Sequence, residues 1–152
     1  MAHKGRFVSP PIRLNADRRN WNVQRADIEI YGIDQSGPSF EGRVFLNNPG
    51  ANLHTPTLPE NGYAGSFHVY GYGIWPADIG KDPEAQKAAA RETVRAPIDK
   101  FVVVTEAVRA AAERSEEVTV TVVPVYPGNP PRDAGDALKL DHVRIVLRQV
   151  LM

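Results

Sequence analysis

The sequence predicts an all-β protein: an antiparallel β-sandwich with one or two short helices and an extended N-terminal arm. At least six segments alternate apolar and polar residues at the period of a β-strand, and clusters of turn-forming residues separate them. Only two short stretches have helical character. A chain of 152 residues with 42% hydrophobic residues suits a single domain with its own core.

The arm is expected to cover residues 1–25, and the sandwich residues 26–152. The arm contains Pro10-Pro11 and little apolar periodicity. It carries a basic excess over the single acid Asp17, with Lys4, Arg6, Arg13, Arg18, Arg19 and Arg25. This charge favours an arm lying on an acidic surface of its own chain or of a partner, and the alternative is a solvated tail. Trp21 and other apolar residues favour docking, because a free tail gains nothing from them.

Three strands are expected in the first half of the sandwich. The segments are "ADIEIYGI" from Ala26, "FEGRVFLNN" from Phe40, and "GSFHVYGYG" from Gly65. A loop rich in Pro, Asn and Thr joins the second strand to the third. Gly71 and Gly73 weaken a strand interior, so they indicate a bulge or a close backbone approach.

The second half adds helices and strands in turn. "KDPEAQKAAARETVRAP" predicts a surface helix inserted before the strand "IDKFVVV", and a short helix then runs from Thr105 as N-cap to Arg114. In "EEVTVTVVPVYP" the valines at 118, 120 and 122 face one way and Thr119 and Thr121 the other. The apolar phase of "LKLDHVRIVLRQVL" changes, which predicts a bulge near Asp141–His142.

Composition excludes several classes of function. The chain has no cysteine, which rules out disulfides and thiolate chemistry, and its formal net charge of zero gives no bulk attraction to nucleic acid or to a membrane. No segment resembles a signal peptide or reaches membrane-spanning length. We therefore expect a cytoplasmic protein, or one exported only together with a partner.

The sequence predicts no catalytic residue, no cofactor and no metal site. The four histidines, His3, His54, His68 and His142, lack the spacing of metal-binding pairs. Two alternatives remain open. One is a small hydrolytic or metal-dependent enzyme that uses His68 or His142 with nearby carboxylates. The other is a ligand-binding sandwich with loop 49–62 as its rim.

The order of these segments resembles the C-terminal β-sandwich domain of type-3 copper proteins: the tyrosinases, plant polyphenol oxidases and molluscan hemocyanins. The resemblance covers roughly residues 26–149. It rests on "FEGRVFLNN", on Ala64–Gly71, on the Trp75-Pro76 corner, on Ile98–Val108, on the strand Val118–Val125 and on the final "DHVRIVL". The chain departs from the family in its basic arm, in the inserted helix, and in having no copper domain.

The resemblance implies a non-catalytic accessory subunit that shields or stabilises a tyrosinase-like copper oxidase, another oxidoreductase subunit, or an oligomer of itself. In the family, a bulky side chain near the phenylalanine–glycine strand shields the copper pair. That position carries over to the neighbourhood of Val44, Phe45 and Leu46. Exposed aromatic rings suit interfaces, so Tyr70, Tyr72 and Trp75 join the candidates, together with Arg18, Arg19 and Trp21 of the arm.

Overall fold

A computed structural model describes residues 5–14, 23–71, 84, 97–127 and 138–149. Nine strands, one α-helix and one 3-10 helix lie in these ranges: β1 (Phe7–Val8), β2 (Ile12–Arg13), β3 (Val23–Ile33), β4 (Phe40–Leu46), η2 (Pro59–Asn61), β5 (Tyr63–Val69), β6 (Ile98–Val103), α3 (Thr105–Ala112), β7 (Glu117–Val118), β8 (Val120–Val125) and β9 (His142–Gln149). The all-β prediction is confirmed. No helix in the described ranges is long and apolar enough to cross a membrane.

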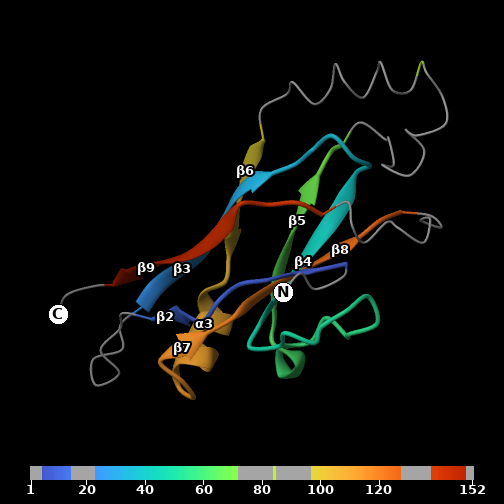
Figure 1. Cartoon of the computed structure of the whole chain (residues 1–152). Coiled ribbons are helices and arrows are strands. Elements are labelled where there is room, and N and C mark those ends of the chain that lie inside the picture. Colours follow the sequence, from blue (N-terminus) through green and yellow to red (C-terminus); the bar gives the residue numbers. More distant parts are fainter. Residues whose placement is uncertain (1–4, 15–22, 72–83, 85–96, 128–137, 150–152) are drawn as a thin grey trace.

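The strands form three sheets, all antiparallel. Their orders are β1-β8-β4-β5, β2-β7 and β6-β3-β9. The three-stranded and four-stranded sheets make the two layers of the sandwich, and α3 lies at the end where β7 begins (Figure 1). One corner between the layers is tight: a side chain at Gly65 of β5 would come within 2.8 Å of Val102 on β6.

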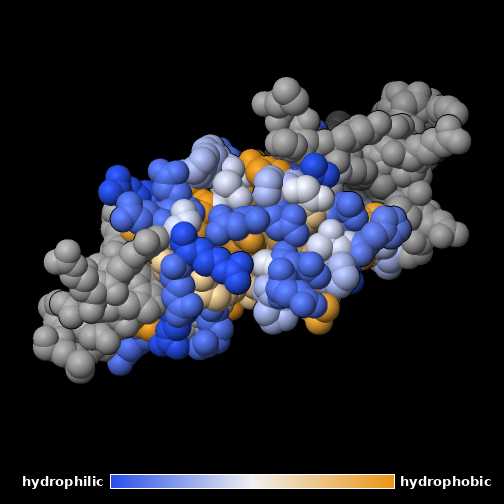
Figure 2. Space-filling model, turned by 90° about the horizontal axis from the view of Figure 1, so that it is seen from below, coloured by the Kyte–Doolittle hydropathy of each residue, from blue (hydrophilic) through white to orange (hydrophobic). Residues whose placement is uncertain are grey.

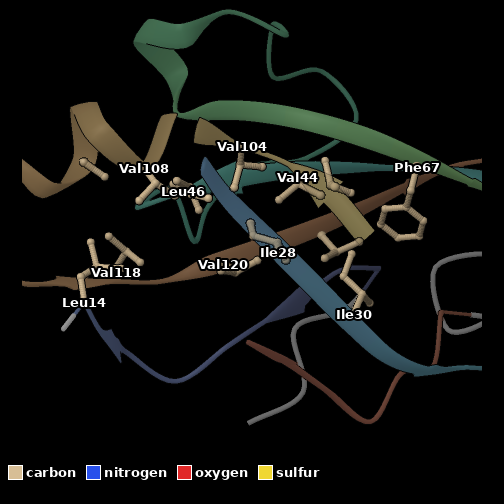
Figure 3. Packing of buried hydrophobic residues seen from close by; sticks show 14 of the residues in the cluster. Leu14, Ile28, Ile30, Val44, Leu46, Phe67, Val104, Val108, Val118 and Val120 are labelled. Atoms are coloured by element: carbon tan, nitrogen blue, oxygen red, sulfur yellow. The ribbon is translucent and has the colours of Figure 1, made fainter. Parts of the chain in front are cut away.

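The main core lies between these layers and is built from alternating aliphatic residues. Ile28 and Ile30 of β3 face Val44 of β4 and Val120 of β8, and Val108 of α3 closes one end (Figure 3). All five side chains are fully buried. The alternation read from the sequence therefore identified the core face of β3 and β8, as expected for strands with one face against a partner layer.

The N-terminal segment 5–14 is extended, as predicted, and it lies on this domain's own sheets. Phe7 pairs with Val122 of β8, and Ile12 pairs with Val118 of β7. The Ser9 hydroxyl accepts a hydrogen bond from the Val120 amide at 2.9 Å, and Leu14 is buried in the main core. Of the surfaces expected for the arm, residues 5–14 lie on that of their own chain, where their strand pairing and the Ser9 hydrogen bond are made.

The helix after β6 differs from the prediction at its start. Val104 is the N-cap residue, and no side chain caps the helix. Thr105 lies inside the first turn, where its hydroxyl accepts a hydrogen bond from the Ala26 amide at 3.1 Å. The threonine thus ties α3 to β3 instead of capping α3, because its hydroxyl faces a buried strand amide.

Two details of the late strands also differ. The segment 117–125 is divided between two sheets at Thr119, and Thr121 is as fully buried as the valines beside it. The bulge expected near Asp141 lies across from it, in β3, where the register with β6 shifts between Ile30 and Ile33. Gly32 adopts φ +70° there, and a side chain on it would meet Asp141 at 2.7 Å. The helix expected in residues 81–97 falls almost wholly outside the described residues.

Candidate interaction surface

The strand proposed to carry the shielding side chain is buried within this chain. Val44 and Leu46 point into the main core. Phe45 points to the other face of β4, where it is 0% exposed and packs with Ala51 and Val123 in a second cluster. Its ring meets Tyr63 edge-on at 5.6 Å. Phe45 is therefore not an exposed interface anchor, because both faces of β4 are covered by the protein itself at residues 44–46.

The cover over Phe45 is loop 47–62, which the chain's own side chains hold in shape. The Asn48 amide donates to the Asn61 carbonyl at 2.9 Å, and the Asn61 amide donates to the Pro56 carbonyl at 3.2 Å. Asn52 accepts from the His54 amide at 2.8 Å. These side-chain-to-backbone bonds are how Asn shapes a turn without strand or helix partners. The loop presents two exposed leucines, Leu53 and Leu58, 51% and 45% exposed.

A groove of about 560 Å³ lies between this loop and α3. One wall is η2 with its flanks, including Glu60 and Asn61, and the other wall is one face of α3. The floor is mainly apolar and is lined by Leu46, Tyr63, Ala64, Val103, Ala107, Ala110 and Ala111. The end of the molecule that holds α3 and the loop is mostly hydrophilic when seen from below, with only small hydrophobic areas (Figure 2).

The outer face of the sheet β6-β3-β9 combines charge with exposed apolar side chains. Phe101 and Val103, two residues apart on β6, are 62% and 58% exposed. Beside them Glu29 pairs with Arg144 at 2.8 Å and accepts the Tyr31 hydroxyl at 2.7 Å. This carboxylate raises the pKa of Tyr31, since ionising the phenol would break its hydrogen bond to Glu29.

Sequence reasoning placed Phe101 in an ordinary strand and missed its exposure. The signal was present in "DKFVVV", where the four consecutive apolar residues 101–104 leave no polar face for solvent. A strand that is apolar on both sides needs a cover on both, and the described part of the chain covers only one of them.

Of the aromatic candidates, Tyr70 is 80% exposed just after β5. The close approach expected at Gly71 is confirmed, because a side chain there would meet the Gly37 carbonyl at 2.0 Å. The remaining candidates lie outside the described residues: Arg18, Arg19, Trp21, Tyr72 and Trp75.

The histidines of the enzyme alternative stand on different sheets. His68 of β5 lies 3.9 Å from Glu41 of β4. His142 of β9 stacks on Tyr31 at 4.8 Å and contacts Asp141 at 2.9 Å. Both histidines are exposed, and within the described ranges no three His, Cys, Asp or Glu residues gather closely enough to hold a metal ion. Neither histidine therefore has the enclosed surroundings of a catalytic centre.

Comparison with known proteins gives a fold but no close relative. No protein-family model matches the sequence, and no curated protein is significantly similar to it. Among solved structures, latent aurone synthase (polyphenol oxidase) from natural source matches with a TM-score of 0.58 and 18% identity, over 99% of this chain and 26% of that one. Recombinantly expressed latent aurone synthase co-crystallized with hexatungstotellurate(VI) matches with a TM-score of 0.54 and 20% identity, over 95% and 24%.

The chain therefore spans about a quarter of the length of the structures it resembles, a share consistent with their C-terminal domain. The resemblance seen in the order of the sequence segments is thus borne out at the level of structure. The described part of the chain has the β-sandwich fold that forms part of latent aurone synthase (polyphenol oxidase).

Proposed function

We propose that this chain is a non-catalytic accessory domain that binds an oxidoreductase core of the tyrosinase type and shields or stabilises it. One observation carries the proposal: the entire chain has the fold of about a quarter of a latent polyphenol oxidase. The dispersed, exposed positions of His68 and His142 favour this reading over the small-enzyme alternative.

The shielding role falls on the loop that follows β4 rather than on β4 itself. Val44, Phe45 and Leu46 serve the two cores of this domain, so they are not available to a partner without unfolding. Leu53 lies close by in the chain, is half exposed, and sits in a loop already ordered by its own hydrogen bonds. A preordered apolar tip loses little entropy on docking, which favours its use as a contact.

The proposal is tested by capturing partners from the native source with the tagged chain, identifying the bound protein, and measuring its oxidation of a diphenol with and without added chain. We expect a copper oxidase whose rate falls as the chain is added. Leu53→Ser is expected to weaken the effect about tenfold or more, as loss of an apolar anchor does. Glu117→Ser, an exposed change on β7, is the matched control. The proposal is wrong if the chain alone oxidises diphenols, or if no captured oxidase responds to it.

A further inference from the structure

We infer that the groove between η2 and α3 is the contact face of a symmetric dimer of this chain. This inference goes beyond the proposed function, because it concerns a second copy and not the oxidase. The two walls of the groove carry charges of opposite sign. Glu60 stands on the η2 wall and Arg114 on the α3 wall, and neither side chain forms an ion pair or hydrogen bond within the described residues. Glu106, the third charged lining residue, is already paired with Arg109 at 2.9 Å.

Opposite charges on the two walls of the groove allow a two-fold dimer to form ion pairs with itself. In a two-fold dimer the same patch lies on both sides, so residue i of one copy meets residue j of the other and the reverse contact is also made. Glu60 of one copy then faces Arg114 of its partner, and the second pair forms at the symmetric place. A partner of single charge sign would satisfy only one of the two walls, which favours a second copy as the occupant.

The apolar residues of the groove can also pair with those of a second copy across a two-fold axis. Leu58, the N-cap residue of η2, is 45% exposed beside the η2 wall. The floor across the groove carries Ala107 and Ala110 of α3, whose small side chains leave room for a larger one. Val103, largely exposed in the single chain, also lies in this floor. The two-fold arrangement places Leu58 of each copy over the alanines of the other and covers Val103.

The test is the mass of the full chain by sedimentation equilibrium over a wide range of concentration. The wild-type chain is expected to form a dimer. Glu60→Arg and Arg114→Glu are each expected to weaken dimerisation about tenfold or more, since each places like charges together at two contacts. Glu113→Arg, a charge reversal on the same helix but outside the groove, is the matched control and is expected to leave the dimer intact.

Combining the two reversals makes the test specific for self-association. The double variant restores both ion pairs with their signs exchanged, so it is expected to dimerise again. An equal mixture of the two single variants is expected to form a heterodimer although each alone stays monomeric. Circular dichroism verifies that the variants remain folded, which is expected because Glu60 and Arg114 are exposed. A wild-type chain that stays monomeric at every concentration overturns the inference, and so does a double variant that stays monomeric.

Failure of this test is separable from failure of the proposed function. If the groove instead receives the oxidase, Glu60→Arg alters capture of the oxidase while the chain alone sediments as a monomer. If both proposals hold, Leu53→Ser weakens the oxidase complex and leaves the dimer unchanged.

Discussion

Gly42 of β4 lies directly under the ring of Phe67 on β5, its cross-strand neighbour. A Cβ at position 42 would come within 2.2 Å of the ring, which is buried and contacts Phe40 at 6.2 Å edge-on. The glycine is therefore needed for space, and the aromatic ring fills the gap that the missing side chain leaves in the sheet.

Gly42→Ala is accordingly expected to destabilise the protein by about 1–3 kcal/mol, the usual effect of overpacking a core. The free energy of unfolding in urea measures it. Gly50→Ala is the matched control, because no atom lies within 4 Å of a side chain at that position. Equal stability of the two variants would show that Phe67 can turn away without loss.

Tyr126, which follows β8, gives the protein a sensitivity to alkaline pH. Burial raises the pKa of its phenol to about 12, because the ionised form is poorly solvated beside Phe40. The unfolded chain ionises near pH 10, so between pH 10 and 12 the unfolded state has lost a proton that the folded state keeps. Stability that is fully present below pH 10 is therefore lost as the pH rises towards 12.

Tyr126→Phe is expected to flatten this part of the pH profile, since it removes the titrating group and keeps the ring. Urea midpoints at pH 9, 10 and 11 for the wild-type chain and the variant measure the difference. Tyr70→Phe, the same change at an exposed ring, serves as the control. Parallel profiles for wild type and Tyr126→Phe would assign the alkaline loss to other groups.

At the scale of elements, loop 47–62 and strand β4 form one unit held by Phe45. Phe45→Ala removes the centre of the small cluster with Ala51 and Val123, so we expect a loss of about 3–5 kcal/mol in the free energy of unfolding. Amide exchange in loop 47–62 should rise with it. Leu53→Ala, at the exposed tip, is the control and should change stability little. A variant with native stability would mean that the loop is not anchored by this ring.

These same elements show which buried residues the sequence could predict and which it could not. Alternation identified Ile28, Ile30 and Val120 as core residues, because a strand with one buried face alternates apolar and polar residues. It could not show that Phe45 is covered as well, because its cover is loop 47–62, which has no apolar periodicity of its own. The exposure of Phe101 was missed for the opposite reason. An apolar residue predicts burial, and only the position of β6 in the three-stranded sheet shows that the Phe101 side chain stays exposed.

At the scale of the whole molecule, the N-terminal segment is part of the fold. Deleting residues 1–14 removes β1 from one edge of β8, β2 from β7, the buried Leu14 and the hydrogen bond from Val120 to Ser9. We expect a lower midpoint of thermal unfolding and self-association through the edge of β8 that is left unpaired. Thermal circular dichroism and light scattering measure the two effects.

Leu14→Ser in the full-length chain is the comparison for this deletion. It is expected to lower stability through lost burial while leaving β1 and β2 in place, so that the chain shows less self-association than the truncated form. A truncated chain that melts like the full-length protein and stays monomeric would mean that residues 5–14 can be dispensed with.

The central place of β3 in its sheet has a consequence for synthesis. Its neighbours are β6 and β9, and the β9 pairing, Ile28 with Ile145 among others, joins two segments that lie far apart in the sequence. A growing polypeptide cannot close the three-stranded sheet until its last strand has left the ribosome, and contacts so distant along the chain make folding slow. Until β9 is synthesised, the apolar residues of β3 remain exposed to chaperones or to segments of the chain that have already folded.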